Sequence, residues 1–178
     1  GLPAGLLHVL PGGAEAGEAL TLDENIASIQ FTGSTQVGRM VGANAGKTLK
    51  KVSLELGGKN SLIILDDADI ERAAENIVWG AFLHSGQICM TSGKILVQEA
   101  IYERLKARVT EKTRQLVVGN PAQENVTIGP LIDEKQCRRV ADLVQAAVTH
   151  GARLETGGDA QRASLRPALP PGVSNNTP

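Results

Sequence analysis

Residues 26–38 read IASIQFTGSTQVG, and they indicate the fold class because a strand pattern passes directly into a helix pattern. Ala27, Ile29 and Phe31 fall on one side of the first run, which is the alternation typical of a strand. The apolar residues after the glycine recur near helical spacing. We therefore predict that Thr32-Gly33-Ser34 turns from a strand into a helix N-terminus.

The alternation of strand and helix signals continues on both sides of this turn and predicts an α/β protein with a largely parallel sheet. An apolar run at 6–10 comes first. Predicted helices occupy 14–20, 35–45, 70–85, 101–116 and 133–150, and predicted strands occupy 26–31, 52–56, 61–65, 94–98 and 152–155. Residues 161–178 are rich in proline and lack periodicity, so we expect an irregular or foreign tail.

The composition excludes several classes of protein. Eighteen basic residues against 19 acidic residues leave a net charge of -1, which argues against nucleic-acid and anionic-membrane partners. No apolar stretch approaches the length of a membrane span, and no secretory signal is evident. Cys89 and Cys137 suit a reducing compartment, so we expect a cytoplasmic protein. Because the chain begins at Gly1 rather than methionine, we also expect a fragment or a processed product.

Three motifs could carry chemistry. In residues 33–38 (GSTQVG), free N–H groups at a helix start could hold a phosphate, although glycine could also serve backbone geometry alone. Glu55 ends a strand beside two glycines, where it could act as a general base or remain a solvated carboxylate. Cys89 lies in a glycine-containing segment between a helix and a strand, where it could be a nucleophile or an inert buried thiol.

The remaining candidates favour structural roles. Cys137 lies within a predicted helix beside Arg138 and Arg139, where an ordinary structural or surface role is expected. The three histidines have no spacing that would form a metal site with either cysteine, so we expect no metal. His84 lies near Cys89 in sequence, but catalytic cysteine and histidine pairs usually meet across a fold.

In combination and in this order, residues 31–38 (FTGSTQVG), 54–59 (LELGGK) and 86–89 (GQIC) resemble the NAD(P)-dependent aldehyde dehydrogenase family. The interval from Glu55 to Cys89 matches the separation expected between that family's general base and its nucleophile. The resemblance covers about residues 1–158. It implies an aldehyde-dehydrogenase-like fragment: the end of a Rossmann-like coenzyme domain at 1–54 and the start of an α/β catalytic domain at 55–160.

The resemblance implies roles for individual residues. Cys89 would attack an aldehyde carbon, and Glu55 would activate water to hydrolyse the resulting thioester to a carboxylic acid. The coenzyme would be NAD or NADP. Gly33 and Ser34 would lie at its pyrophosphate, and Gly38 would allow close helix packing. Leu56 and Gly57 would lie near the nicotinamide.

The resemblance also bears on substrate and assembly. Residues 84–98 look similar to bacterial enzymes that act on aromatic aldehydes such as benzaldehyde or vanillin. The family's other coenzyme-binding residues would lie outside this chain, and only the full-length enzyme would be a homo-oligomer. A truncated inactive remnant and a coenzyme-independent thiol esterase stay open as alternatives. We also expect the isolated chain to be poorly stable, because interior strands would lack neighbours.

Overall fold

The structure, a computed structural model, describes residues 1–158, 160–161 and 164–165. The chain divides into two compact units, Gly1–Gly57 and a second unit that begins at Gly58. Strands and helices alternate in both, as predicted. Within the described residues, no helix is long and apolar enough to cross a membrane.

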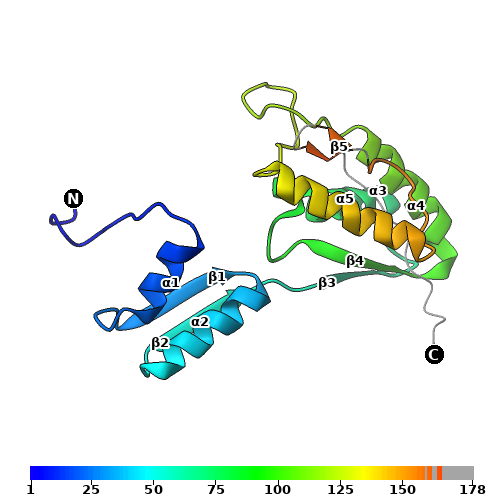
Figure 1. Cartoon of the computed structure of the whole chain (residues 1–178). Coiled ribbons are helices and arrows are strands. Elements are labelled where there is room, and N and C mark those ends of the chain that lie inside the picture. The colour runs from blue at the N-terminus through cyan, green and yellow to red at the C-terminus, as the bar shows by residue number, and fades with distance from the viewer. Residues whose placement is uncertain (159, 162–163, 166–178) are drawn as a thin grey trace. The chain divides into compact units, whose positions relative to one another are not determined.

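The first unit is a parallel strand pair connected by a helix. It contains α1 (Ala14–Leu22), β1 (Ser28–Gly33), α2 (Thr35–Lys47) and β2 (Lys51–Leu56). β1 and β2 pair in parallel from Ser28 opposite Lys51 to Gly33 opposite Leu56, and α2 contacts both strands (Figure 1). The predicted turn from strand to helix is confirmed, because Ser34 is the N-cap of α2.

The apolar run at 6–10 forms neither a helix nor a strand. Leu6, Leu7, Val9 and Leu10 are all more than half exposed. A strand needs a neighbour for its backbone hydrogen bonds, and among the described residues no strand pairs with this run. Hydrophobic sequence alone therefore does not produce a strand here.

The second unit repeats the arrangement of strand, helix and parallel strand, and adds further helices. It contains β3 (Asn60–Ile64), α3 (Ile70–Phe82), a 3-10 turn η1 (Leu83–Gly86), β4 (Ser92–Val97), α4 (Glu99–Arg114) and α5 (Glu134–Thr149). β3 and β4 pair in parallel from Ser61 opposite Lys94 to Ile64 opposite Val97. Two short strands, β5 (Ala160–Gln161) and β6 (Ser164–Leu165), form an antiparallel pair.

The core of the second unit lies where α3 and α4 pack together against the strand pair (Figure 1). Its buried members are Ile64, Ala73, Ala74, Ile77, Ile101, Leu105 and Val109. Asp69 is the N-cap of α3 and accepts a hydrogen bond from the Arg72 N–H at 2.8 Å, and the helix begins at residue 70 as predicted. Local capping and a shared apolar face therefore set this part of the fold.

Ion pairs connect the exposed faces of the same two helices. Arg108 on α4 contacts Glu71 on α3 at 2.5 Å, and Lys112 contacts Glu75 at 3.0 Å. The hydrogen bond from Arg108 lowers the pKa of Glu71 below its ordinary value. The hydrogen bond to Glu75 raises the pKa of Lys112.

Two expectations need correction, and one lies largely outside the described residues. The strand predicted at 152–155 is wrong: these residues are irregular, because no described strand pairs with them. The helix predicted to end near Ser85-Gly86 ends at Phe82, and η1 continues to Gly86, where φ is +71°. Of the tail at 161–178, residues 162–163 and 166–178 lie outside the part that the structure describes.

Candidate functional site

The carboxyl ends of β1 and β2 bring most of the predicted site residues together. In the parallel register, Thr32 lies opposite Glu55 and Gly33 lies opposite Leu56. The Gly57 N–H donates to the Gly33 carbonyl at 3.3 Å, so this edge is closed by a hydrogen bond. Ligands of α/β sheets bind outside the carboxyl ends of the strands. This edge is therefore the place in the first unit where a coenzyme could bind.

The start of α2 supplies groups suited to an anion. The Ser34 side chain accepts a hydrogen bond from the Val37 N–H at 3.3 Å. The first turn of α2 has no acidic residue to compete with a bound phosphate. The N–H groups of a helix N-terminus and the helix dipole both favour negative charge, so the local chemistry fits a pyrophosphate.

Gly33 and Gly38 occupy positions where a side chain would collide with a neighbour. A Cβ at Gly38 would lie 2.5 Å from Cδ2 of Leu56, and a Cβ at Gly33 would lie 2.5 Å from the ring of Phe31. Gly38 is buried, so its missing side chain lets α2 approach β2 closely. The glycines therefore have a packing role at this edge, whatever binds there.

Glu55 is exposed on β2, and its side chain has no hydrogen bond or ion pair with any described residue. Its carboxylate is accessible to water and to a ligand. The local geometry thus suits a general base, and it equally suits the solvated strand-end carboxylate that the sequence left open.

Cys89 lies in the second unit, in the turn between η1 and β4, and it is exposed. Cys137 lies on α5 and is only 4% exposed. A nucleophilic thiol must be accessible to its substrate, whereas a buried thiol behaves as a small apolar side chain. The two cysteines therefore differ in accessibility: the Cys89 thiol can be reached by a ligand, and the Cys137 thiol cannot.

Two residues beside Cys89 were missed by sequence reasoning. The Asn60 side-chain amide donates to the Cys89 carbonyl at 2.6 Å and to the Thr91 carbonyl at 3.2 Å. The Thr91 hydroxyl accepts from the Ile88 N–H at 3.2 Å. The only signal for Asn60 is its polar side chain at the start of a strand that ends in three apolar residues, and that signal does not identify a partner 29 residues away.

The histidines do not assemble a metal site in the described part of the chain. His8 contacts the Gly5 carbonyl and His150 contacts the Ala146 carbonyl, each within its own local segment. Among the described residues, no group of three or more histidine, cysteine or acidic side chains could hold a metal ion.

Comparison with known proteins places the chain in a family. The model of the aldehyde dehydrogenase family matches residues 1–177. Vanillin dehydrogenase of an Amycolatopsis species is 47% identical over the whole chain, which spans 37% of that enzyme. Benzaldehyde dehydrogenase [NAD(+)] of Pseudomonas putida is 48% identical over 90% of the chain and 33% of that enzyme.

The solved structures that resemble this chain include aldehyde dehydrogenases as well. An aldehyde dehydrogenase of Mycobacterium tuberculosis complexed with NAD+ aligns with 98% of this chain and 37% of its own, at a TM-score of 0.93 and 40% identity. Matching structures are described as complexes with NAD+ and, in another case, with NADP.

The family match covers nearly the whole chain, but the chain covers only part of each relative. The match of the family model extends through residues 161–177, and the irregular or foreign tail stays a prediction. The chain spans little more than a third of the relatives' length. Its α/β fold nevertheless superimposes on a solved member over 98% of this chain. The chain therefore belongs to the aldehyde dehydrogenase family.

Proposed function

We propose that the protein carrying this chain oxidises an aldehyde to a carboxylic acid with NAD(P)+, using Cys89 as the nucleophile and Glu55 as the general base. The single observation that carries the proposal is the exposed thiol of Cys89 in a hydrogen-bonded turn, within a chain that matches the family from residue 1 to 177. The accessible Glu55 carboxylate at the end of β2 adds support.

The chemistry follows from these two side chains. The Cys89 thiolate adds to the aldehyde carbon and forms a thiohemiacetal. When bound, NAD(P)+ supplies the acceptor for the hydride that leaves this carbon, and a thioester on Cys89 remains. Glu55 takes a proton from a water molecule, which attacks the thioester carbonyl and releases the carboxylic acid. The backbone N–H of Cys89 would help to hold the oxyanion formed at each addition.

The first unit would hold the coenzyme. Its pyrophosphate would lie at the start of α2, beside Gly33 and Ser34, and the nicotinamide end would lie near Leu56 and Gly57. Gly38 supports this arrangement by allowing α2 to pack on Leu56. We accordingly propose that the coenzyme-domain part extends to Gly57 rather than to residue 54, since all of β2 pairs with β1.

The proposed substrate is an aromatic aldehyde, because the vanillin and benzaldehyde dehydrogenases are among the relatives most similar to the chain. A homo-oligomeric state of the complete enzyme and a cytoplasmic location stay predictions. Matching structures carry either NAD+ or NADP, so the assay below compares both coenzymes.

Steady-state and single-turnover assays of the intact natural protein test this proposal. With benzaldehyde or vanillin and NAD+ or NADP+, we expect NAD(P)H formation that Cys89→Ser abolishes and the matched variant Cys137→Ala preserves. Glu55→Gln should still give a burst of NAD(P)H equal to the enzyme concentration, followed by turnover reduced about 10²–10⁴-fold, because thioester hydrolysis loses its base.

The two alternatives are distinct outcomes of the same assays. Ester hydrolysis that depends on Cys89 but needs no coenzyme, with no aldehyde oxidation, would identify a thiol esterase. Absence of both activities in a folded protein would identify an inactive remnant. Aldehyde oxidation that persists in Cys89→Ser would contradict the proposed nucleophile.

A further inference from the structure

We propose that Asn60 and Thr91 are positioning residues that hold the backbone on both sides of Cys89 and so aim its thiol. This inference rests on the proposed function, because it takes Cys89 as the nucleophile. Its observations are independent of the family match: they are the hydrogen bonds of one turn in the second unit.

The peptide before Cys89 is held by the main chain of Thr91, whose own position in the turn is fixed by its side-chain hydroxyl. The Thr91 N–H donates to the Ile88 carbonyl at 3.0 Å, which closes a four-residue turn with Cys89 at its second position. Because a trans peptide is planar, fixing the Ile88 carbonyl also fixes the direction of the Cys89 N–H. That N–H is the backbone group assigned above to the oxyanion.

The peptide after Cys89 is held by Asn60. Its side-chain nitrogen donates to the Cys89 carbonyl at 2.6 Å and to the Thr91 carbonyl at 3.2 Å. Only the NH2 group of an amide can donate to carbonyl oxygens, so this orientation of the side chain follows from its partners. With both flanking peptides held, φ and ψ of Cys89 are set, and they determine the direction of its Cα–Cβ bond.

The Thr91 hydroxyl adds two further hydrogen bonds within this turn; we call the hydrogen bonds made by Asn60 and Thr91 the clamp. It accepts a hydrogen bond from the Ile88 N–H at 3.2 Å and donates one to the Gly86 carbonyl at 3.2 Å. Both capacities of the hydroxyl, as a donor and as an acceptor, are therefore used within the turn. The hydroxyl links the end of η1 to the residue that precedes β4.

Asn60 is anchored at the start of the strand pair of the second unit. Asn60 is the first residue of β3 and pairs with Ser92 of β4, and Ile64 at the other end of β3 belongs to the core. An exposed turn would otherwise sample several conformations, since little apolar surface holds it. A support that extends from a packed strand pair keeps the nucleophile in one geometry, which is what rapid attack requires.

Kinetics of the intact natural protein with benzaldehyde and its coenzyme test the inference. We expect Asn60→Ala and Thr91→Val to lower kcat about 10–100-fold while KM for the aldehyde stays within about twofold, because substrate contacts are unchanged and the thiol is misdirected. Thr91→Ser keeps the hydroxyl and should restore most of kcat. Asn60→Asp, which cannot donate to carbonyls when ionised, should not restore activity. Asn76→Ala, at an exposed position on α3, is the matched control and should leave kcat unchanged.

The controls separate positioning from loss of fold. Cys137 is buried, so its alkylation rate reports unfolding near α5 and should stay as slow in the variants as in the parent. If Asn60→Ala exposes Cys137, the comparison between Thr91→Val and Thr91→Ser decides the question.

Three results would overturn the inference. A kcat within about twofold of the parent in both Asn60→Ala and Thr91→Val, while Cys89→Ser is inactive, would refute the positioning role and leave the proposed function standing. Equal loss in Thr91→Val and Thr91→Ser would show that the hydroxyl does not act as described. Full activity in Cys89→Ser would remove the proposed function and this inference together.

Discussion

The two units of this chain share one topology but differ in the helices that pack on each strand pair. β1–α2–β2 and β3–α3–β4 are both parallel strand pairs joined by a helix. In the first unit, one helix covers the pair with small side chains, and Val41 and Ala45 are its buried apolar residues. In the second, α3 and α4 together bury a cluster of seven residues. A common topology therefore carries a thinly covered strand pair in one unit and a larger buried core in the other.

The difference follows from the residues that face each strand pair. Gly38 lets α2 approach Leu56 so closely that no side chain fits between them. α3 and α4 instead bring larger side chains such as Ile77 and Leu105, which bury more apolar area. Stability should consequently depend on the buried side-chain volume in the second unit, and on the close contact between α2 and Leu56 in the first.

The largest expected effect comes from removing volume in the second unit. Leu105 is 1% exposed, so Leu105→Ala should lower the free energy of unfolding by about 2–5 kcal/mol. Val41→Ala, the comparable change in α2, removes two carbons and should cost about 1.5 kcal/mol at roughly 0.8 kcal/mol per buried CH2. Trp79, the single tryptophan, lies on α3 and its fluorescence follows the second unit during denaturation.

A control keeps this comparison specific to burial. Leu143 on α5 is 60% exposed, so Leu143→Ala should change the free energy of unfolding by no more than about 0.5 kcal/mol. Similar losses from Leu105→Ala and Leu143→Ala would mean that the cluster is not the core of the second unit.

A smaller effect should come from filling the close contact in the first unit. Gly38→Ala places a Cβ against Leu56 and should cost about 1–2 kcal/mol, because Leu56 or α2 must move. Gly46→Ala lies on the same helix with open space around it and should stabilise by about 0.5–1 kcal/mol. Amide hydrogen exchange of α2 measures both, and equal responses at the two positions would contradict the packing role of Gly38.

The smallest expected effect concerns the charges that connect α3 and α4. The pKa of Glu71 is lowered from an ordinary value of 4.5 by Arg108, so the pair stabilises the fold above pH 4.5. This stabilisation should disappear as the pH falls through the lower pKa of the folded state. Acid titration of the free energy of unfolding should therefore show less change below pH 4.5 in Glu71→Gln than in the parent.

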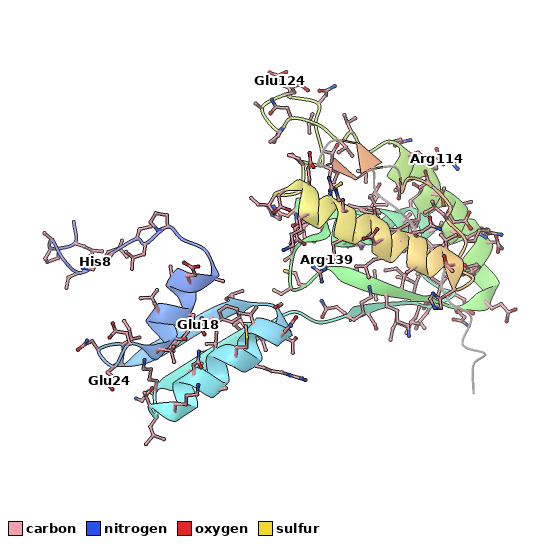
Figure 2. The ribbon with its side chains drawn as sticks, viewed as in Figure 1. His8, Glu18, Glu24, Arg114, Glu124 and Arg139 are labelled. Carbon is pink, nitrogen blue, oxygen red and sulfur yellow. The ribbon has the colours of Figure 1, made fainter. Side chains whose placement is uncertain are left out.

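Glu124 provides the matched control for the acid titration. It is exposed in the loop between α4 and α5, and Figure 2 shows it at the tip of that loop. Glu124→Gln should retain the acid dependence of the parent. The same flattening in Glu124→Gln as in Glu71→Gln would show that net charge, and not the pair with Arg108, causes the effect.

Helix starts, which depend on neighbours in sequence, were predicted correctly, whereas the predicted end of α3 was wrong. Ser34 and Asp69 begin α2 and α3 as N-caps because each side chain bonds to an N–H three residues later. The strand at 152–155 failed because alternating apolar residues indicate a strand only where another strand offers hydrogen bonds. The candidate site follows the same division: sequence motifs led to the prediction of Glu55 and Cys89, which stays a prediction, whereas no motif pointed to Asn60 or Thr91.

By itself, the sequence determined the α/β class, the helix starts and the order of the motifs, because caps, glycine turns and apolar periodicity act over a few residues. Only the tertiary structure decided which strands pair, which cysteine is exposed and which side chain holds the turn of Cys89. Asn60 and the Cys89 carbonyl are 29 residues apart in the chain. Their contact depends on the pairing of β3 with β4, and no local pattern encodes that pairing.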